Sequence, residues 1–226
     1  VEIQWDLLAA IGVPPPSRDR HPVSMPVLPD VAAQGDARLE TLAAGAGTRL
    51  VVMHVSAGNP FRRWPIASFA EVARGLTQAD PSVRVVVTSG PSEAGAAAEV
   101  IDGARAGLDE SRRPYVLSCG KFSLAELRVL VQRAALYIGG DSGPMHIAAC
   151  SPVPMVSIYG PTLPVRSEPW RSRHIPAAAV EVHGLSCRPC DQRTCEPGDF
   201  RCLGHISPAE VLAAATSLLS GHSANG

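Results

Sequence analysis

Short runs of apolar residues alternate with amphipathic stretches across the middle of the chain. A run that is apolar at nearly every position is typical of a strand covered on both faces. Apolar positions spaced by three and four residues indicate helices with one buried stripe. The predicted strands are 49–55, 83–89, 115–118, 136–138 and 153–159, and helices are predicted to begin near 65, 90, 123 and 143. This alternation predicts an α/β fold, a mostly parallel sheet with helices on both of its faces.

The flanking segments are less regular. The apolar spacing predicts a helix over 1–12 and a short helix over 36–44, and the proline-rich segment 13–35 is predicted to be an extended connector. A last short strand is predicted over 180–182. A capping box, with proline at the first helical position, predicts a C-terminal helix over about 206–220.

The run 136–150 carries the strongest candidate for chemistry. A strand followed by two glycines and a helix that opens on Gly-Pro presents free backbone N–H groups, which bind anions. Ser142 would add a hydroxyl, Asp141 would hold the turn or accept from a sugar hydroxyl, and His146 follows one helical turn after Ser142. A capped turn without any ligand remains an alternative. A Ser–His hydrolase is disfavoured because the G-x-S-x-G elbow is absent from the sequence.

Two other predicted strands also end in polar loops. The loop 56–65 offers backbone N–H groups at 56–58 and two guanidiniums, Arg62 and Arg63, a side-chain type that suits phosphate. For each arginine, a solvated position on the surface without a ligand is an equally good interpretation. The loop 160–162 follows the last long strand. Because ligands of open parallel sheets bind at the carboxyl ends of the strands, we expect these loops to meet at one site.

Composition and charge exclude some classes of function. The 226 residues suit one large domain or two small ones, and 46% of them are apolar. A formal net charge of -1 argues against a general nucleic-acid or membrane-surface binder. No apolar run approaches the roughly 20 residues that span a bilayer, and no signal-peptide pattern is visible. The chain begins with Val1, so we expect a fragment of a longer protein.

Four of the six cysteines lie close together near the C-terminus. They are Cys187, Cys190, Cys195 and Cys202, spaced C-x2-C-x4-C-x6-C. Two disulfides, one tetrahedral structural zinc site, or reduced thiols are the alternatives, and a reducing cytosol favours zinc over disulfides. A zinc ion held by four cysteines would staple a loop and have no open position for catalysis. Cys119 and Cys150 are predicted to be ordinary buried residues.

Three motifs in order resemble glycosyltransferase family 9, the heptosyltransferases. They are MHVSAG at 53–58 with RRWP at 62–65, GDSGPMHIAA at 140–149, and YGPT at 159–162. The resemblance covers about 49–220, and the cysteine cluster before the last helix also recurs in many members. It implies that the chain is the C-terminal, donor-binding half of a GT-B enzyme. Residues 1–48 would be the end of the N-terminal half and the connector, and 49–226 the Rossmann-like nucleotide-sugar domain.

The resemblance also implies a reaction, the transfer of heptose from an ADP-activated sugar to the growing core of lipopolysaccharide. The donor diphosphate would be held by Ser56, Ala57, Gly58, Arg62, Asp141, Ser142, Gly143 and His146, and the nucleoside by Glu93 and Met145. Arg62 departs from the lysine usual in the family, and Val55 and Ser56 depart from its usual Pro-Gly. Glu93 in the first turn of a helix also has a structural reason, since a carboxylate there favours the helix dipole.

The family's catalytic base lies in the N-terminal half, so the resemblance implies no catalytic residue in this chain and no activity by the chain alone. It implies no required cofactor, with a structural zinc at the four cysteines left open, and an ADP-sugar and a lipid-linked glycan as partners. We expect no nucleic-acid partner, no transmembrane segment, and a cytoplasmic enzyme peripheral to the inner membrane. The alternatives are another nucleotide-sugar enzyme with this half, such as an epimerase, and a non-catalytic, zinc-stapled interaction module.

Overall fold

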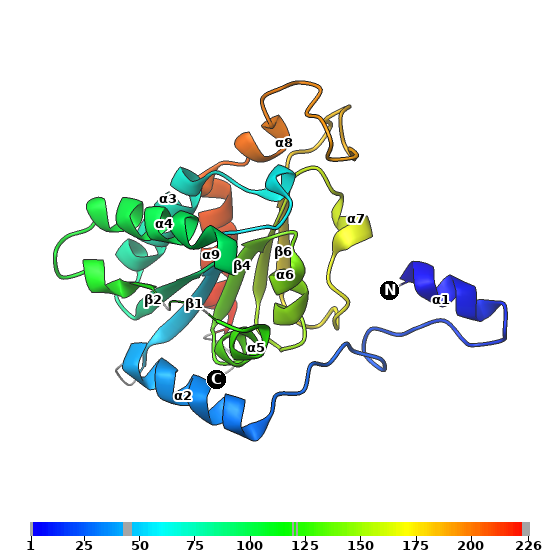
Figure 1. Ribbon diagram of the computed structural model, residues 1–226, viewed down its shortest axis with the longest axis horizontal. Helices are drawn as coiled ribbons and strands as arrows, with labels where there is room; N and C mark the ends of the chain where they lie inside the picture. The colour runs from blue at the N-terminus through cyan, green and yellow to red at the C-terminus, as the bar shows by residue number, and fades with distance from the viewer. Residues whose placement is uncertain (1, 43–46, 119, 121, 223–226) are drawn as a thin grey trace.

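The computed structural model describes residues 2–42, 47–118, 120 and 122–222. Its centre is a six-stranded sheet in the order β3-β2-β1-β4-β5-β6, with all neighbouring strands parallel (Figure 1). The strands are β1 Arg49–His54, β2 Val83–Thr88, β3 Val116–Ser118, β4 Leu136–Gly140, β5 Met155–Tyr159 and β6 Ala177–Glu181. The predicted parallel α/β sheet is confirmed. Its strand order reverses between β1 and β4, the position where open parallel sheets bind ligands.

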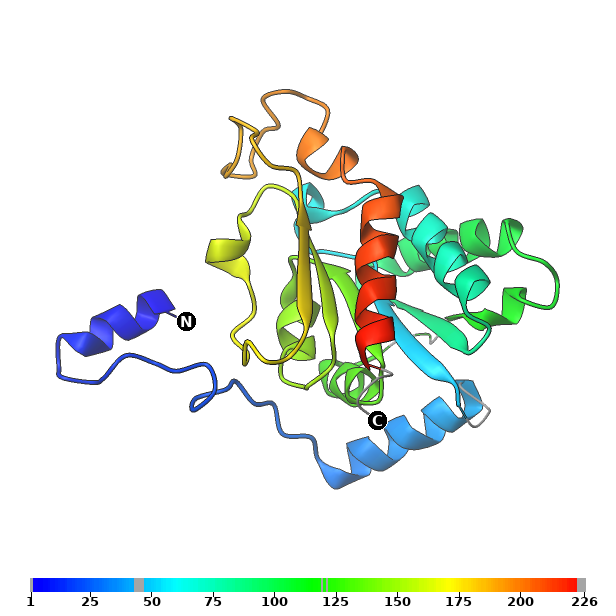
Figure 2. The same ribbon diagram turned by 180° about the vertical axis from the view of Figure 1, so that it is seen from behind.

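Helices cover both faces of the sheet, as predicted (Figures 1 and 2). The helices α3 Ile66–Ala79, α4 Ala94–Ala106 and α9 Pro208–His222 pack on one face, and α2 Pro29–Leu42, α5 Leu124–Gln132 and α6 Gly143–Ala148 lie on the other. Side chains of β1 alternate between the two cores: Val51 and Met53 join the first, Leu50 and Val52 the second. Burial on both faces explains why the strand sequences are apolar throughout.

The remaining elements are short. They are α1 Glu2–Ala9, η1 Pro60–Arg62, η2 Pro91–Glu93, η3 Arg113–Tyr115, α7 Pro164–Ser167 and α8 Arg201–Gly204. The helix α1 stands apart from the sheet in both views (Figures 1 and 2). Among the described residues, no helix is long and apolar enough to cross a membrane.

Two helix starts follow the capping chemistry written in the sequence. The Ser123 hydroxyl accepts from the Glu126 N–H at 3.2 Å, and the Glu126 carboxylate accepts from the Ser123 N–H at 2.7 Å. Ser207 and Glu210 make the same reciprocal pair at 3.3 and 2.8 Å. Both capping boxes are thus confirmed, and they fix where α5 and α9 begin.

The predicted extended connector over 13–35 is wrong in its last part, because α2 begins at Pro29 rather than at 36. Proline suits the first turn of a helix, and Asp30 in that turn interacts favourably with the helix dipole. The helix packs on α5, where Gly35 lies so close to Val129 that a Cβ would approach its Cγ1 to 2.6 Å. The predicted end of this helix, 43–44, lies outside the described residues, and the domain boundary at 48 stays a prediction.

Two smaller differences concern a strand and a cysteine. The last strand, Ala177–Glu181, begins earlier than the predicted 180–182 and pairs in parallel with β5. Cys150 is partly exposed rather than buried; it follows the short α6, and its thiol donates to the His146 carbonyl at 3.4 Å. Cys119 lies outside the described residues.

Candidate functional site

A pocket of about 270 Å³ lies at the reversal point of the sheet, and we call it the switch-point pocket. Its lining comes from the carboxyl ends of β1, β2 and β4 and from the start of α5: residues 54, 56–58, 88–93, 122–124, 127 and 142–144. The strand register explains this meeting, because His54 is paired with Thr88 on one side and with Gly139 on the other. The structure therefore brings together the predicted loops at 56–58 and 142–144.

The buried His54 organises one wall of the pocket. Its Nδ1 lies 3.0 Å from the Thr88 Oγ1, and its Nε2 lies 3.0 Å from the Ser56 Oγ. The Thr88 hydroxyl donates to the Met53 carbonyl at 3.3 Å, so it accepts from Nδ1–H. The Ser56 Oγ accepts from the Gly90 N–H at 2.7 Å and donates its own proton to Nε2. This continuous chain fixes one tautomer and joins the β1 loop to the β2 loop.

Burial lowers the pKa of His54 from its ordinary value of 6.5 to about 4, so the ring is neutral at pH 7. The neutral form is also the one that the hydrogen bonds require, because Nε2 must accept. Sequence reasoning passed over this residue. The available signal was a histidine at the last position of an otherwise apolar strand, where a side chain meets the loops of neighbouring strands.

A second link, between Arg63 and Glu93, closes the outer wall. The Arg63 Nη2 lies 2.6 Å from the Glu93 Oε1, and its Nε donates to the Ala57 carbonyl at 2.8 Å. A Cβ on Gly90 would lie 2.6 Å from the Glu93 Oε2, so the carboxylate bends over the Gly90 backbone. Arg63 thus links the loop after β1 to the loop after β2. Glu93 lines the pocket, and one of its two carboxylate oxygens is paired with Arg63.

The predicted Asp141 and Arg62 form an ion pair beside the pocket rather than within its lining. The Asp141 side chain is 3% exposed, and its Oδ2 accepts from the Thr162 hydroxyl at 2.6 Å and lies 3.3 Å from the Arg62 Nη1. Asp141 therefore connects the third predicted loop, 160–162, to the other two. This interior role accounts for a carboxylate in an anion-binding run, since Arg62 and the Thr162 hydroxyl compensate its burial.

The start of α6 presents Ser142 and Gly143 to the pocket. The helix has six residues, so its dipole is small, and Pro144 contributes no N–H. The Met145 N–H donates to the Ser142 carbonyl at 3.1 Å, so it is not free to bind a ligand. The Ser142 hydroxyl is buried and has no hydrogen-bond partner among the described residues. A buried hydroxyl without a partner beside a pocket is available to a polar ligand.

The expectation that Met145 contacts a nucleoside is not supported by its position. Its side chain is fully buried in the core under α6, where its sulfur accepts from the Tyr159 hydroxyl at 3.7 Å. On a helix of six residues the sequence alone does not show which face turns inward. His146, the next residue, is exposed and does not line the switch-point pocket.

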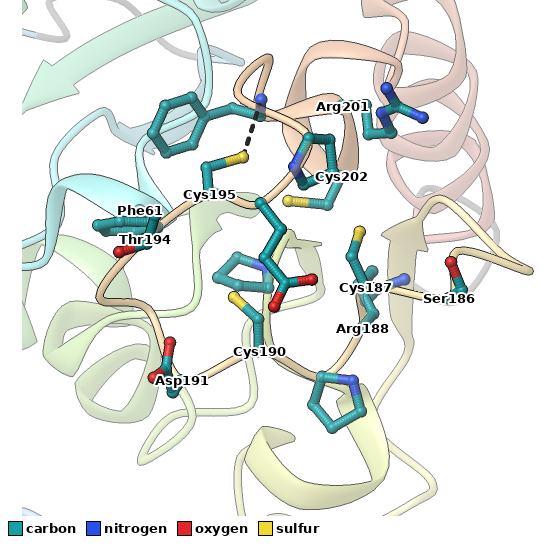
Figure 3. Close-up of a pocket in the computed structure, with 15 residues that line it drawn as sticks. Phe61, Ser186, Cys187, Arg188, Cys190, Asp191, Thr194, Cys195, Arg201 and Cys202 are labelled. Atoms are coloured by element: carbon teal, nitrogen blue, oxygen red, sulfur yellow. Dashed lines mark hydrogen bonds between the residues drawn. The ribbon is translucent and has the colours of Figure 1, made fainter.

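The four clustered cysteines line a second cavity, of about 520 Å³ (Figure 3). We call residues 182–202 the cysteine-rich segment. Figure 3 shows the four thiols arranged around the cavity from different stretches of this segment. The Cys195 sulfur accepts a hydrogen bond from the Phe200 N–H at 3.4 Å. The four cysteines are free thiols, so the structure has no disulfide here.

The cysteine-rich segment is anchored next to the switch-point pocket. The Cys190 N–H donates to the Pro161 carbonyl at 3.3 Å, and the Arg188 Nη2 donates to the Thr162 carbonyl at 2.7 Å. Four thiols suit a thiophilic cation, but among the described residues no group of three or more His, Cys, Asp or Glu is arranged to hold a metal ion. The four cysteines are therefore the right kind of ligand for a metal ion, but in this structure they are not placed to coordinate one.

Comparison with known proteins gives a consistent result. The sequence profile of "Glycosyltransferase family 9 (heptosyltransferase)" matches residues 20–200. Lipopolysaccharide heptosyltransferase 3 of Escherichia coli is 33% identical over 178 residues, which cover 78% of this chain and 48% of that protein. The chain spans about half the length of the curated relatives it matches.

Two solved structures share the fold. E. coli ADP-heptose lps heptosyltransferase II superposes with a TM-score of 0.68 at 21% identity, over 88% of this chain and 54% of that one. The iron-containing dodecameric glycosyltransferase TibC from enterotoxigenic E. coli H10407 superposes with a TM-score of 0.55 at 17% identity, over 79% of this chain and 48% of that one.

Proposed function

The chain belongs to glycosyltransferase family 9, the heptosyltransferases, and we propose that it is the donor-binding half of an enzyme that transfers heptose from an ADP-activated sugar to a lipopolysaccharide-core-type acceptor. One observation carries the proposal. The loops at 56–58 and 142–144, which lie in two of the family motifs, line one pocket at the point where the strand order reverses. The names of the relatives support the sugar and acceptor classes.

In this proposal the donor is bound by backbone N–H groups of the pocket and by the Arg62 guanidinium beside it. The diphosphate lies against the N–H groups at 56–58 and at Ser142 and Gly143, with the Ser142 hydroxyl donating to a phosphate oxygen. Glu93 accepts from a ribose hydroxyl of the nucleoside with the oxygen that Arg63 leaves available. Such donors favour the bound anion because they are already in place and need no reorganisation.

The same groups serve the chemical step. As the bond from the sugar to the β-phosphate breaks, negative charge develops on the departing ADP. Arg62 and the N–H groups around the phosphates stabilise this charge, each typically by a few kcal/mol. A base in the N-terminal half deprotonates the acceptor hydroxyl, so this chain supplies leaving-group stabilisation and no catalytic base. The boundary between connector and donor domain lies at about 48 in this proposal.

Titration calorimetry with ADP, UDP and ADP-heptose tests the proposal. We expect ADP compounds to bind more tightly than UDP, and Arg62→Ala and Ser142→Ala to weaken binding by about tenfold or more each. Arg193→Ala is the matched control, because that side chain is 87% exposed. Preference for UDP compounds would favour an epimerase-like enzyme instead. A folded chain that binds no nucleotide would contradict the donor-binding role.

We also propose that the four cysteines bind a structural metal ion, with zinc as the first candidate. The support is that Cys187, Cys190, Cys195 and Cys202 line one cavity, and that one structural neighbour is described as iron-containing. Small shifts of the segment would be needed to bring the thiols into a tetrahedral set. We expect elemental analysis of protein purified without added metal to show one zinc per chain. If iron were found instead, the bound metal would be iron. If no metal were found, the thiols would be reduced and unliganded, and the proposal would be wrong.

The location follows from the acceptor. An enzyme that adds sugars to a lipid-linked core works where that lipid is exposed, so we place it on the cytoplasmic side of the inner membrane. Co-sedimentation of the tagged enzyme with membrane fractions, reversed by salt, would support a peripheral association.

A further inference from the structure

Gln192 joins the cysteine-rich segment to the loop 56–65, beside the switch-point pocket. Its Oε1 accepts from the Arg62 Nε at 2.6 Å and from the Asn59 Nδ2 at 3.0 Å. These partners lie 130 and 133 residues away in the sequence. Gln192 has a backbone φ of 60°, a left-handed conformation that residues other than glycine rarely adopt. The turn around Gln192 thus places one amide oxygen between two donors of the loop 56–65.

The guanidinium of Arg62 is held at two of its three nitrogens. The Nε donates to Gln192, and the Nη1 lies 3.3 Å from the Asp141 Oδ2. The Nη2 has no partner among the described residues. A planar guanidinium recognises phosphate through the direction of its N–H groups, so fixing two nitrogens fixes where the third one points. A lysine would need no such orientation, because its charge is compact and its donors rotate.

The same segment also holds the other partner of Arg62. The Arg188 guanidinium donates to the Thr162 carbonyl at 2.7 Å, and the Thr162 hydroxyl donates to Asp141 at 2.6 Å. Asn59 accepts from the Phe61 N–H at 3.0 Å and so fixes the turn that carries Arg62. Of the two partners of the guanidinium, Gln192 thus belongs to the cysteine-rich segment, and Asp141 is linked to that segment through Thr162.

We propose that Gln192 is a positioning residue for the donor diphosphate: it orients the Arg62 guanidinium toward the phosphates without touching them. This inference rests on the proposed donor-binding function. It gives the cysteine-rich segment a role in donor affinity.

A double-mutant cycle on ADP affinity tests the proposal, with parent, Gln192→Ala, Arg62→Ala and the double variant. We expect Gln192→Ala to weaken ADP binding about three- to tenfold, because the guanidinium loses a hydrogen bond that orients it. Arg62→Ala should weaken binding more, and the double variant should equal Arg62→Ala alone, since Gln192 acts only through that side chain. Thr194→Ala, on an exposed residue of the same segment, is the control.

Gln192→Glu separates orientation from general damage to the segment. The carboxylate introduced in this variant would still accept from Arg62, but its negative charge would repel the phosphates. The Gln192→Glu variant should therefore bind ADP more weakly than the Gln192→Ala variant does, while its midpoint of urea unfolding stays equal to that of the parent. Equal ADP affinity of parent and Gln192→Ala would overturn the positioning role alone, and so would an undiminished Gln192→Ala effect in the Arg62→Ala background. A folded parent that binds no ADP would overturn the proposed function, and this role with it.

Discussion

The switch-point pocket and the cysteine-rich segment are neighbours, yet they are stabilised in different ways. The pocket is built on strand ends, and its polar groups are tied to one another by short contacts, such as His54 with Thr88 and Ser56. The cysteine-rich segment has little regular structure, and its four thiols surround a cavity without forming disulfides among themselves. The comparison teaches that a parallel sheet pre-organises one site, whereas the other depends on what its thiols bind.

The largest expected effect on stability comes from comparing an aspartate beside the pocket with one in the cysteine-rich segment. Asp141→Ala should destabilise the protein by about 3 to 4 kcal/mol, because it leaves the Arg62 charge and the Thr162 hydroxyl without their buried partner. The value is in the lower part of the usual range because Arg62 is 31% exposed. Asp191→Ala should cost less than about 0.5 kcal/mol, because that side chain is 66% exposed. Urea unfolding of both variants measures the contrast, and equal losses would refute it.

A second test uses the pH dependence of stability. Burial lowers the pKa of His54 from 6.5 to about 4, so the unfolded chain takes up the proton first as the pH falls. This contribution to stability is complete above about pH 6.5 and should decline toward pH 4 by about 3 kcal/mol in all.

Unfolding by urea at several pH values, in the parent and in His54→Gln, isolates the effect, because the variant should lose this part of the slope. His174→Gln is the control, since that side chain is 88% exposed. Parallel stability curves for parent and His54→Gln would show that the histidine is not held neutral, and that the pocket is less rigidly organised than we infer.

The parts of the fold that were predicted are those that depend on neighbouring residues. Apolar runs fixed the central strands to within a residue or two at most ends, and the serine–glutamate pairs at Ser123 and Ser207 located two helix starts. The start of α2 at Pro29 was missed because a proline-rich stretch suggested a connector, although proline also suits a first turn. Local signals of this kind can favour two structures at once.

The candidate site was predicted only in part, for a physical reason. The meeting of the loops at 56–58 and 142–144 followed from the parallel order of the strands. The His54 chain, the use of Arg63 against Glu93 and the contact of Gln192 with Arg62 join residues up to 130 positions apart. No local pattern records such contacts. Met145 illustrates the same limit from the other side, because its burial in the core could not be read from the motif, which does not state which of its residues pack inward.

The smallest expected effect on stability most directly tests the contrast between the pocket and the cysteine-rich segment. Cys190→Ser, measured by urea unfolding with reductant and chelator present, should change the free energy of unfolding by less than about 0.5 kcal/mol. The reason is that Cys190 is only partly buried and its thiol makes no hydrogen bond among the described residues. With zinc added, the parent should gain stability and Cys190→Ser should gain less. A large loss in the metal-free variant would mean that the polypeptide alone holds this segment as firmly as the sheet holds the pocket.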